Sequence, residues 1–248
     1  MFLDFFTSES FQNALEILKT QFPLAIWETL YVTVLATFFA IVLGLPLGVL
    51  LVAGEDGKIL RVPRGVLHVL NVIINLLRSV PFLILMIMVF PLSRLLIGTA
   101  VGTTATIVPL VVAAFPFVAR LVEGSLREMD PGVIEAAQAM GCTPFQIIRK
   151  VVLPESLPSL LTSFTTAFVT ILGYGAMSGA IGGGGLGNMA INRGHTRGMT
   201  LVLYVAVIVL VILVQIFQSV GGHFALSLDR RSRGRIKKSK RQSAAPKD

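Results

Sequence analysis

Four long stretches of the chain contain no charged residue: 29–53, 95–119, 157–181 and 199–217. A helix needs roughly 20 apolar residues to cross the hydrocarbon core of a bilayer, and each stretch is about that long. Only 14% of the chain is charged and 54% is hydrophobic, which leaves too little polar surface to cover a soluble protein. These stretches therefore predict an all-α integral membrane protein.

A fifth apolar stretch, residues 67–90, is rich in Leu, Ile, Val, Met and Phe but also holds polar side chains. We expect it to cross the membrane as well, which gives five spans within a transmembrane domain of residues 24–225. The polar residues of this stretch are His68, Asn71, Asn75 and Arg78.

The basic residues between the spans predict the orientation, because Lys and Arg collect in cytoplasmic loops. With the N-terminus outside and the C-terminus in the cytoplasm, sixteen Lys and Arg lie inside and four outside. The four external residues are Lys19, Arg94, Arg193 and Arg197. The opposite orientation would leave the basic C-terminal tail outside the cell.

The two ends of the chain lie beyond the predicted spans. Residues 1–23 carry acidic residues before their only base, Lys19, so they do not resemble a cleavable signal peptide. Residues 10–22 have a helical apolar period, which predicts a short helix along the outer membrane surface. Residues 226–248 form a basic tail that follows a span directly, so attraction to anionic lipid headgroups explains it better than binding to nucleic acid.

The loop between the third and fourth spans, residues 130–153, contains the signals of two short helices. Asp130 suits an N-cap, and Pro131 suits the first position of a helix that should stop at Gly141. Thr143 is expected to cap a second helix that ends before Pro154. The loop is therefore predicted to hold two helices joined by a sharp turn.

The second of these helices is expected to carry Phe145, Ile148 and Val152 on one apolar face. Such a face needs a cover, and the residues leave two possibilities open. It packs on the protein's own spans, or it docks into a groove on a partner protein. A helix-turn-helix that reads DNA is excluded, because both ends of the element are tethered to the bilayer.

Glu135-Ala136-Ala137 is followed after three residues by Gly141, and after nine more by Val151-Val152-Leu153-Pro154. This spacing resembles the EAA loop of bacterial ATP-binding-cassette importer permeases, with Val151 in place of Ile as the one departure. The resemblance implies a type I importer permease fold whose cytoplasmic loop inserts into a separate ATPase subunit. It assigns coupling to the ATPase to Glu135, Ala136, Ala137, Gly141, Phe145, Ile148, Leu153 and Pro154.

Three further segments, 78–82, 102–120 and 173–187, resemble the permease branch of methionine importers. The resemblance covers residues 24–225 and implies a homodimer in the bacterial cytoplasmic membrane, with two ATPase subunits and an external solute-binding lipoprotein. ATP and Mg²⁺ would bind to the partner ATPase, so this chain is expected to hold no cofactor. The implied solute is methionine or a related amino acid.

Residues 173–181 are unusually rich in Gly, Ala and Ser around a single large residue, Met177. Small residues allow close approach of two helices, so Met177 either fills a packing gap or helps to close a pathway. Arg78 is a functional candidate because a charge is costly in hydrocarbon, although it can also extend toward the membrane surface. The candidate pathway or gate residues are Met177, Tyr174, Ser178 and Arg78.

The glycine-rich stretch Gly182–Gly187 formally fits a nucleotide-binding fingerprint, but it follows a membrane span instead of a soluble strand. We expect it to form a flexible external turn, or alternatively a moving gate element. The three histidines are scattered, and the sequence contains no phosphate-binding loop, metal-ligand cluster or nucleophile–base pair. The chain is thus predicted to be a non-catalytic transport subunit.

Three rival interpretations remain. An importer of the same class could carry another small solute, such as a different amino acid or an organic anion. An ion-coupled secondary transporter would usually show two related halves and intramembrane carboxylates, which four of the five predicted spans lack. A membrane scaffold without transport activity would leave the capped helices of residues 130–153 unexplained.

Overall fold

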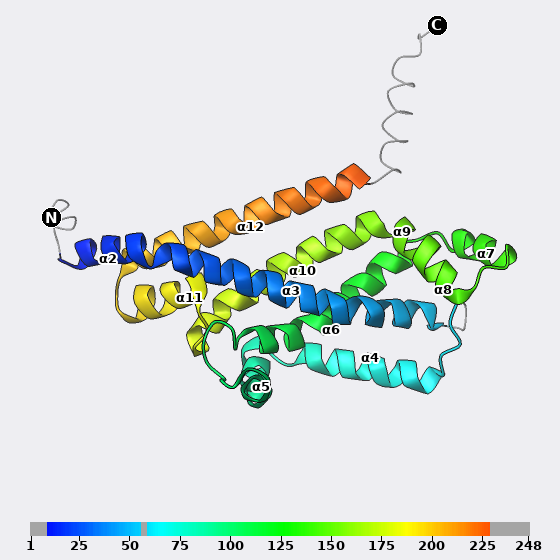
Figure 1. Cartoon of the computed structure of the whole chain (residues 1–248), viewed down its shortest axis with the longest axis horizontal. Helices are drawn as coiled ribbons and strands as arrows, with labels where there is room; N and C mark the ends of the chain where they lie inside the picture. Colours follow the sequence, from blue (N-terminus) through cyan, green and yellow to red (C-terminus); the bar gives the residue numbers. More distant parts are fainter. Residues whose placement is uncertain (1–8, 56–58, 229–248) are drawn as a thin grey trace, which may run out of the picture.

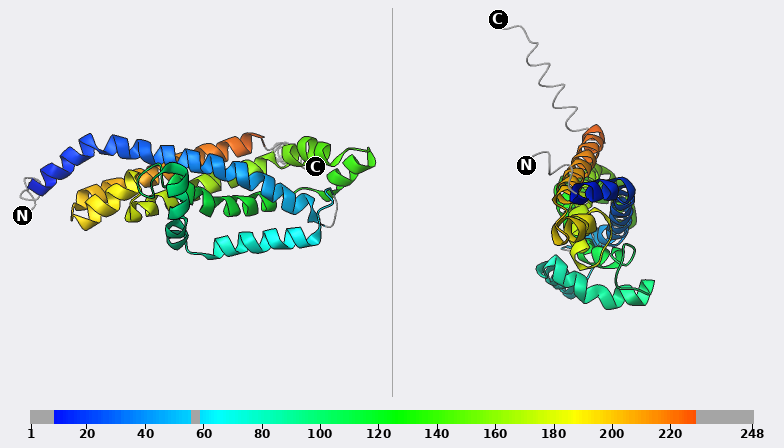
Figure 2. Two further views of the ribbon diagram at one scale, coloured as in Figure 1. Left: turned by 60° about the horizontal axis from the view of Figure 1, so that its bottom comes forward. Right: turned by 90° about the vertical axis from the view of Figure 1, so that its left-hand side faces the viewer.

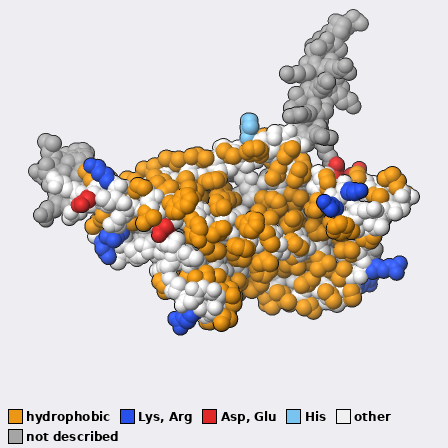
Figure 3. Space-filling view, viewed as in Figure 1, with side chains coloured by type: hydrophobic (Ala, Val, Ile, Leu, Met, Phe, Trp, Pro, Cys, Tyr) orange, Lys and Arg blue, Asp and Glu red, His pale blue; other side chains and the backbone are white. Residues whose placement is uncertain are grey.

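The computed structural model describes residues 9–55 and 59–228 and is built of helices. Figure 1 shows an elongated bundle in which α3 (Phe22–Ala53), α6 (Ile107–Arg127), α10 (Leu157–Ser178) and α12 (Thr200–Leu228) run along the long axis. Each of these four is long and apolar enough to cross a membrane. Apolar side chains cover the middle of the face seen in Figure 3, and charged side chains gather toward its two ends.

The packing of α3 against α6 forms the core of the bundle. Four small residues of α3, spaced four apart, are buried along one face: Ala36, Ala40, Gly44 and Gly48. A Cβ atom at Gly44 would lie 2.8 Å from the Val118 Cβ, and one at Gly48 would lie 2.7 Å from the Val122 Cβ. The two helices therefore approach as closely as they do because these positions lack a larger side chain.

The stretch predicted as one span over 67–90 is divided into two helices, α4 (Arg64–Ser79) and α5 (Phe82–Ile97), which meet at 110°. A proline disfavours helical backbone in the residue before it and donates no hydrogen bond, and Val80 before Pro81 is extended (φ −75°, ψ 127°). Figure 2 shows α4 running beside the bundle and α5 running across its long axis, where α5 packs against α6. The two together can still count as one broken span.

The helix expected over 95–119 is α6, which covers Ile107–Arg127 and so begins twelve residues later than predicted. Gly98 adopts φ +87° and ends α5, and Gly102 adopts φ +109° in the turn that follows. The shift brings charged residues into the C-terminal part of α6, where they pair with one another as described below. Hydropathy alone placed the span too early.

The other predicted spans agree with the helices more closely. Residues 29–53 lie within α3, residues 157–181 match α10 with a 3₁₀ turn, η3 (Gly179–Ile181), and α12 extends the stretch 199–217 to Leu228. Helix α2 (Glu9–Thr20) confirms the short helix expected before the first span. Its predicted place on the membrane surface stays a prediction, and most of the basic tail, residues 229–248, lies outside the described residues.

At one end of the bundle lie α7 (Pro131–Ala139), α8 (Pro144–Ile147), the π-helical segment η2 (Ile148–Val152) and α9 (Leu153–Glu155). At the opposite end lie α11 (Gly185–Asn188) and a second π-helical segment, η4 (Met189–Thr196). The loop of residues 130–153 and the glycine-rich turn are thus at opposite ends of the molecule.

Candidate functional site

The loop between α6 and α10 begins with a capped helix, as the sequence predicts. The Asp130 carboxylate accepts a hydrogen bond from the backbone N–H of Gly132 at 2.9 Å, and Pro131 occupies the first turn of α7. Such caps satisfy backbone donors that the helix itself leaves without a partner. The start of α7 is therefore fixed by local interactions.

The turn between α7 and α8 is equally well defined. Gly141 adopts φ +77°, a left-handed conformation that favours glycine. Thr143 and Gln146 form a capping box: the Thr143 hydroxyl accepts from the Gln146 N–H at 3.4 Å, and the Gln146 side chain accepts from the Thr143 N–H at 2.9 Å. The sharp turn predicted between two short helices is confirmed.

The second helix does not end before Pro154, as the sequence had suggested. The chain stays helical through the π-helical segment η2 and through α9, which contains Pro154. The Leu153 N–H donates to the Ile148 carbonyl, five residues back, so the helix is widened by one residue ahead of the proline. Pro154 lacks an N–H, but the first turn of a helix leaves its N–H groups without partners within the helix in any case, so the segment continues through Pro154 to Glu155.

The apolar face predicted for Phe145, Ile148 and Val152 is divided by this geometry. Val152 is only 2% exposed and Ile148 is half-buried, and both belong to the core of the protein's own spans. Phe145 is 68% exposed, and Met140, which the sequence did not single out, is 76% exposed. Packing on the protein's own spans therefore holds for Ile148 and Val152, whereas Met140 and Phe145 face outward and docking on a partner stays a prediction.

The other residues assigned to this loop fall on both sides of it. Glu135, Ala136 and Pro154 are exposed, whereas Ala137 is buried and Leu153 packs against the core. The loop is thus anchored from within through Ala137, Ile147 and Val152. We define the exposed side of the loop, Glu135, Ala136, Met140 and Phe145, as the outer face of the loop.

A cluster of charged side chains lies on the last turns of α6, directly before this loop. Glu123 bridges two arginines: its carboxylate lies 2.6 Å from Arg120 Nη1 and 2.8 Å from Arg127 Nη2. Arg120 also donates to the Asn75 side chain on α4 at 2.9 Å, and Arg127 lies 3.0 Å from Glu55 after α3. The cluster therefore joins α3, α4 and α6 at the end of the bundle that carries the loop.

Helix α10 presents hydroxyl groups along one side. The hydroxyls of Thr162, Thr166 and Thr170 each donate to the carbonyl four residues earlier, at 3.2, 3.0 and 2.8 Å. At 100° per residue, these three and Met177 fall on one face of the helix. A helix in the membrane thus has a polar side that continues to Met177, which is 49% exposed.

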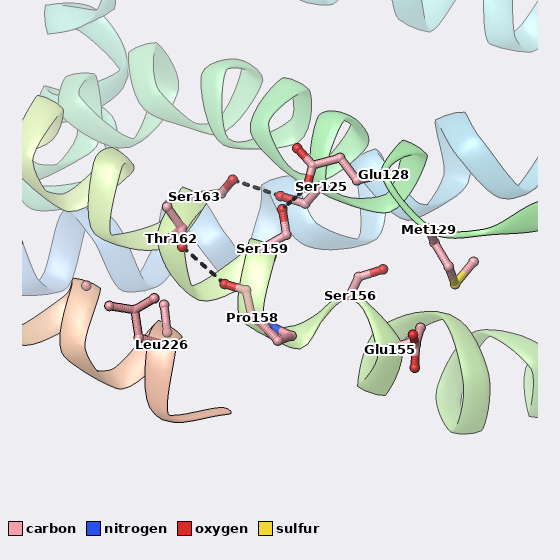
Figure 4. Close-up of a pocket in the computed structure, with 12 residues that line it drawn as sticks. Ser125, Glu128, Met129, Glu155, Ser156, Pro158, Ser159, Thr162, Ser163 and Leu226 are labelled. Carbon is pink, nitrogen blue, oxygen red and sulfur yellow. Dashed lines mark hydrogen bonds between the residues drawn. The ribbon is translucent and has the colours of Figure 1, made fainter. Parts of the chain in front are cut away.

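A cavity of about 640 Å³ adjoins the start of this polar side, between α10, the end of α6 and α12 (Figure 4). Serine and carboxylate groups meet at its wall: Ser159 donates to Glu128 at 2.6 Å, and Ser125 and Ser163 are bonded at 2.8 Å. The cavity is open and lies on the side of the molecule that carries the loop.

The four candidate pathway residues are not brought together. Tyr174, Met177 and Ser178 lie on the last turns of α10, but Ser178 is buried and donates to the Gly175 carbonyl at 2.6 Å. The ring of Tyr174 stacks on Phe82 of α5. Arg78 is exposed on the last turn of α4, four residues before Phe82.

The glycine-rich turn is tightly packed, which corrects the expectation of a flexible turn. Gly183, Gly185 and Gly187 are buried, and the Gly102 N–H donates to the Gly182 carbonyl at 2.9 Å. The Asn188 side chain donates to the Gly183 carbonyl at 2.7 Å. Among the described residues, no group of three His, Cys, Asp or Glu could hold a metal ion.

Comparison with known proteins connects these features to one family. Residues 40–230 match the family model described as the binding-protein-dependent transport system inner membrane component. The D-methionine transport system permease protein MetI of Yersinia pestis is 48% identical over 132 residues, and its probable counterpart in Pasteurella multocida is 54% identical over 130 residues. The first alignment covers 53% of this chain and 60% of that relative, the second 52% and 59%.

Solved structures match over a longer part of the chain. A chain of the inward-facing MetNI methionine ABC transporter aligns with a TM-score of 0.80 and 43% identity, covering 82% of this chain and 94% of that one. A chain of an amino acid ABC transporter with histidines has a TM-score of 0.70 but only 20% identity, so it shows the fold alone.

Proposed function

Because this chain belongs to the family of binding-protein-dependent transport system inner membrane components, we propose that it forms the translocation pathway of an ATP-driven methionine importer. Two copies would enclose the pathway, and two separate ATPase subunits would drive it. An external binding protein would deliver the solute. The N-terminus would lie outside and the C-terminus in the cytoplasm. ATP and Mg²⁺ would bind to the ATPase, so this chain contributes no catalytic residue.

The observation that carries the proposal is the outer face of the loop. Met140 and Phe145 are large apolar side chains, yet they are 76% and 68% exposed at the tip of a rigid, capped turn. A large exposed apolar side chain on a rigid element is typical of an anchor that enters a groove on a partner. Glu135 on the same side adds a charge that can specify that partner.

The loop is also connected to the spans that would have to move. Its buried side packs into the core through Ala137, Ile147 and Val152, and the Glu123 cluster joins the preceding helix to α3 and α4. A displacement of the loop by an ATPase would therefore be passed to several spans at once. This arrangement supports alternating access driven from the cytoplasmic side.

The polar side of α10 supports a pathway between two copies. Hydroxyl groups that face a membrane interior need a partner or water, and Thr162 and Thr166 are exposed in the single chain. In a dimer these residues would line a hydrated route that Met177 closes at its outer end. Methionine is proposed as the solute because it appears in the names of the matching relatives, which are 43–54% identical to this chain.

The test is transport by the reconstituted complex. The chain is co-purified with its proposed ATPase, placed in proteoliposomes together with the proposed binding protein, and supplied with ATP inside and labelled methionine outside. The proposal expects ATP-dependent uptake that requires the binding protein. Uptake of a different solute only would overturn the methionine assignment, and uptake driven by an ion gradient without ATP would overturn the importer class.

A further inference from the structure

A single carboxylate on α3 joins three segments that are far apart in the sequence. Glu28 Oε1 accepts a hydrogen bond from the Thr103 hydroxyl at 3.0 Å, and Oε2 accepts from the Gly185 N–H at 2.7 Å. The neighbouring Thr29 hydroxyl accepts from the Leu186 N–H at 2.8 Å. The outer half of α3 therefore binds both the turn after α5 and the glycine-rich turn after α10.

The glycines of that turn are explained by the same contact. A Cβ atom at Gly184 would lie 2.8 Å from Glu28 Oε2, and one at Gly185 would lie 2.5 Å from the Thr29 hydroxyl. Gly185 also adopts φ +75°, which favours glycine. The backbone reaches the carboxylate only because these two positions have no side chain.

The glycine-rich turn in turn fixes the end of α10. The Gly183 N–H donates to the Ser178 carbonyl at 2.9 Å, and the Asn192 side chain donates to the Gly179 carbonyl at 3.2 Å. A Cβ at Gly179 would collide with the backbone of Asn188. Met177, the residue directly before Ser178, is thus held through this turn to α3.

The surroundings of Glu28 explain why its carboxylate binds the Thr103 hydroxyl and the Gly185 N–H strongly. Glu28 is half-buried in a helix that spans the membrane, and the partners recorded for it in the described part of the chain are a hydroxyl and a backbone N–H. Hydrogen bonds to a charged acceptor are about twice as strong as those between neutral groups, and a charge in a membrane needs such partners. Loss of the carboxylate would release both segments together.

We propose that Glu28 is a positioning residue that clamps α3, the turn of residues 98–106 and the glycine-rich turn into one rigid outer unit, which sets the position of Met177. This inference rests on the proposed transport function. The unit stays intact in every state of the transport cycle, so the pathway opens between units of two copies and not within one unit.

A covalent substitute for the clamp provides the test. The Cβ that a side chain at Gly184 would add lies 3.0 Å from the Thr103 Cβ, about 0.5 Å closer than disulfides require, so the two turns must move apart slightly to accept the bond. Thr103→Cys and Gly184→Cys are combined, with Cys142→Ala to remove the native thiol, in backgrounds with Glu28 and with Glu28→Ala. Glu16→Ala, an exposed carboxylate at the same end of the molecule, is the matched control.

The expected results follow from a clamp that does not open. Glu28→Ala lowers ATP-dependent uptake about tenfold, Glu28→Gln lowers it less because the amide oxygen still accepts, and Glu16→Ala leaves it unchanged. Thr103→Cys removes one donor and a Cβ at Gly184 crowds Glu28 Oε2, so the reduced cysteine pair lowers uptake in both backgrounds, and oxidation restores uptake in both. Normal uptake by Glu28→Ala, or no recovery on oxidation, overturns the proposal.

One measurement, the yield of the disulfide, requires neither a known solute nor a Glu28→Ala variant that folds. With Glu28 present, the disulfide should form to the same yield in the nucleotide-free complex and in the complex trapped with ATP. A yield that falls in one state, or a disulfide that blocks ATP hydrolysis, means that the unit opens and overturns the clamp. A wild-type complex that moves no methionine overturns only the proposed solute.

Discussion

The ring of Phe82 stacks face to face on the ring of Tyr174, with centroids 4.3 Å apart and planes inclined by 9°. Phe82 is the first residue of α5 after the 110° break, and Tyr174 lies on the last turns of α10. The broken span is thereby held to α10. Tyr174, which the sequence suggested as a pathway residue, is occupied by this contact.

We expect a measurable coupling between these two rings. Tyr174→Phe should keep the free energy of unfolding in mixed micelles, because the stack needs no hydroxyl. A double-mutant cycle with Phe82→Ala and Tyr174→Ala should give a coupling of about 1 kcal/mol. Strictly additive losses would show that the stack contributes nothing beyond burial.

The turn of the loop should be required for coupling and not for assembly in the membrane. Gly141→Val places a β-branched residue at φ +77°, which costs about 1–3 kcal/mol and displaces Phe145. We expect normal membrane insertion with loss of binding-protein-stimulated ATP hydrolysis. Gly65→Val, at an exposed glycine with free space around it, should retain that stimulation.

The outer face of the loop gives a second test of coupling. Phe145→Ser and Glu135→Lys leave the buried side of the loop untouched, so the permease itself should remain folded. Both should weaken co-purification of the ATPase subunit, with Phe145→Ser losing at least about tenfold in affinity if it is an anchor. Full retention of the ATPase in both variants would contradict the assignment of this face.

Labelling of cysteines tests the orientation. Cys142 is half-buried in the loop and should be protected from an impermeant thiol reagent added to whole cells. His195→Cys, at an exposed position of η4 at the opposite end of the molecule, should react when combined with Cys142→Ala. The reverse labelling pattern would invert the topology.

Met177 and Ser178 are neighbours with opposite exposures, 49% and 1%. If two copies of Met177 meet at the outer end of the pathway, Met177→Cys should form a disulfide-linked dimer in the nucleotide-free complex, since such a bond needs Cα atoms within about 7 Å. Trapping with ATP should reduce the cross-link. Ser178→Cys serves as the buried control, and equal cross-linking of both would rule out a specific contact.

The carboxylate of Glu123 should be important for stability, because it bridges two arginines with only 11% of its side chain exposed. Glu123→Gln leaves Arg120 and Arg127 incompletely neutralised and should lower the free energy of unfolding by about 3 kcal/mol. Glu128→Gln, at an exposed residue bonded to Ser159, should cost about 1 kcal/mol. Equal effects would mean that the cluster is not cooperative.

Features set by neighbouring residues could be predicted from the sequence. The cap at Asp130, the capping box of Thr143 and Gln146, and the left-handed turn at Gly141 depend on contacts within a few residues, so their sequence signals were sufficient. The family resemblance of the loop is supported by the match over residues 40–230. The coupling roles of individual residues stay predictions.

Features set by tertiary contacts could not be predicted. The bond between Glu28 and Gly185 joins residues 157 positions apart, and no local signal marks either one as its partner. The extension of α6 to Arg127 was missed because hydropathy does not register charges that neutralise one another, as Arg120 and Glu123 do. Met140 was missed because its importance comes from exposure, which composition does not reveal.

The π-helical segment Ile148–Val152 has a consequence for how insertions and deletions would be tolerated. A π-helical turn is an α-helix that carries one additional residue, so deletion of Lys150 would regularise the segment into an α-helix. Because the wider turn already absorbs that residue, the helix on either side of the deletion would keep nearly the same direction, whereas a deletion within a regular α-helix rotates everything before it by about 100° about the helix axis. Phe145 would therefore keep its orientation after the loss of Lys150. The π-helical segment is thus the place in this loop where the chain can lose one residue without turning the outer face of the loop away from a partner.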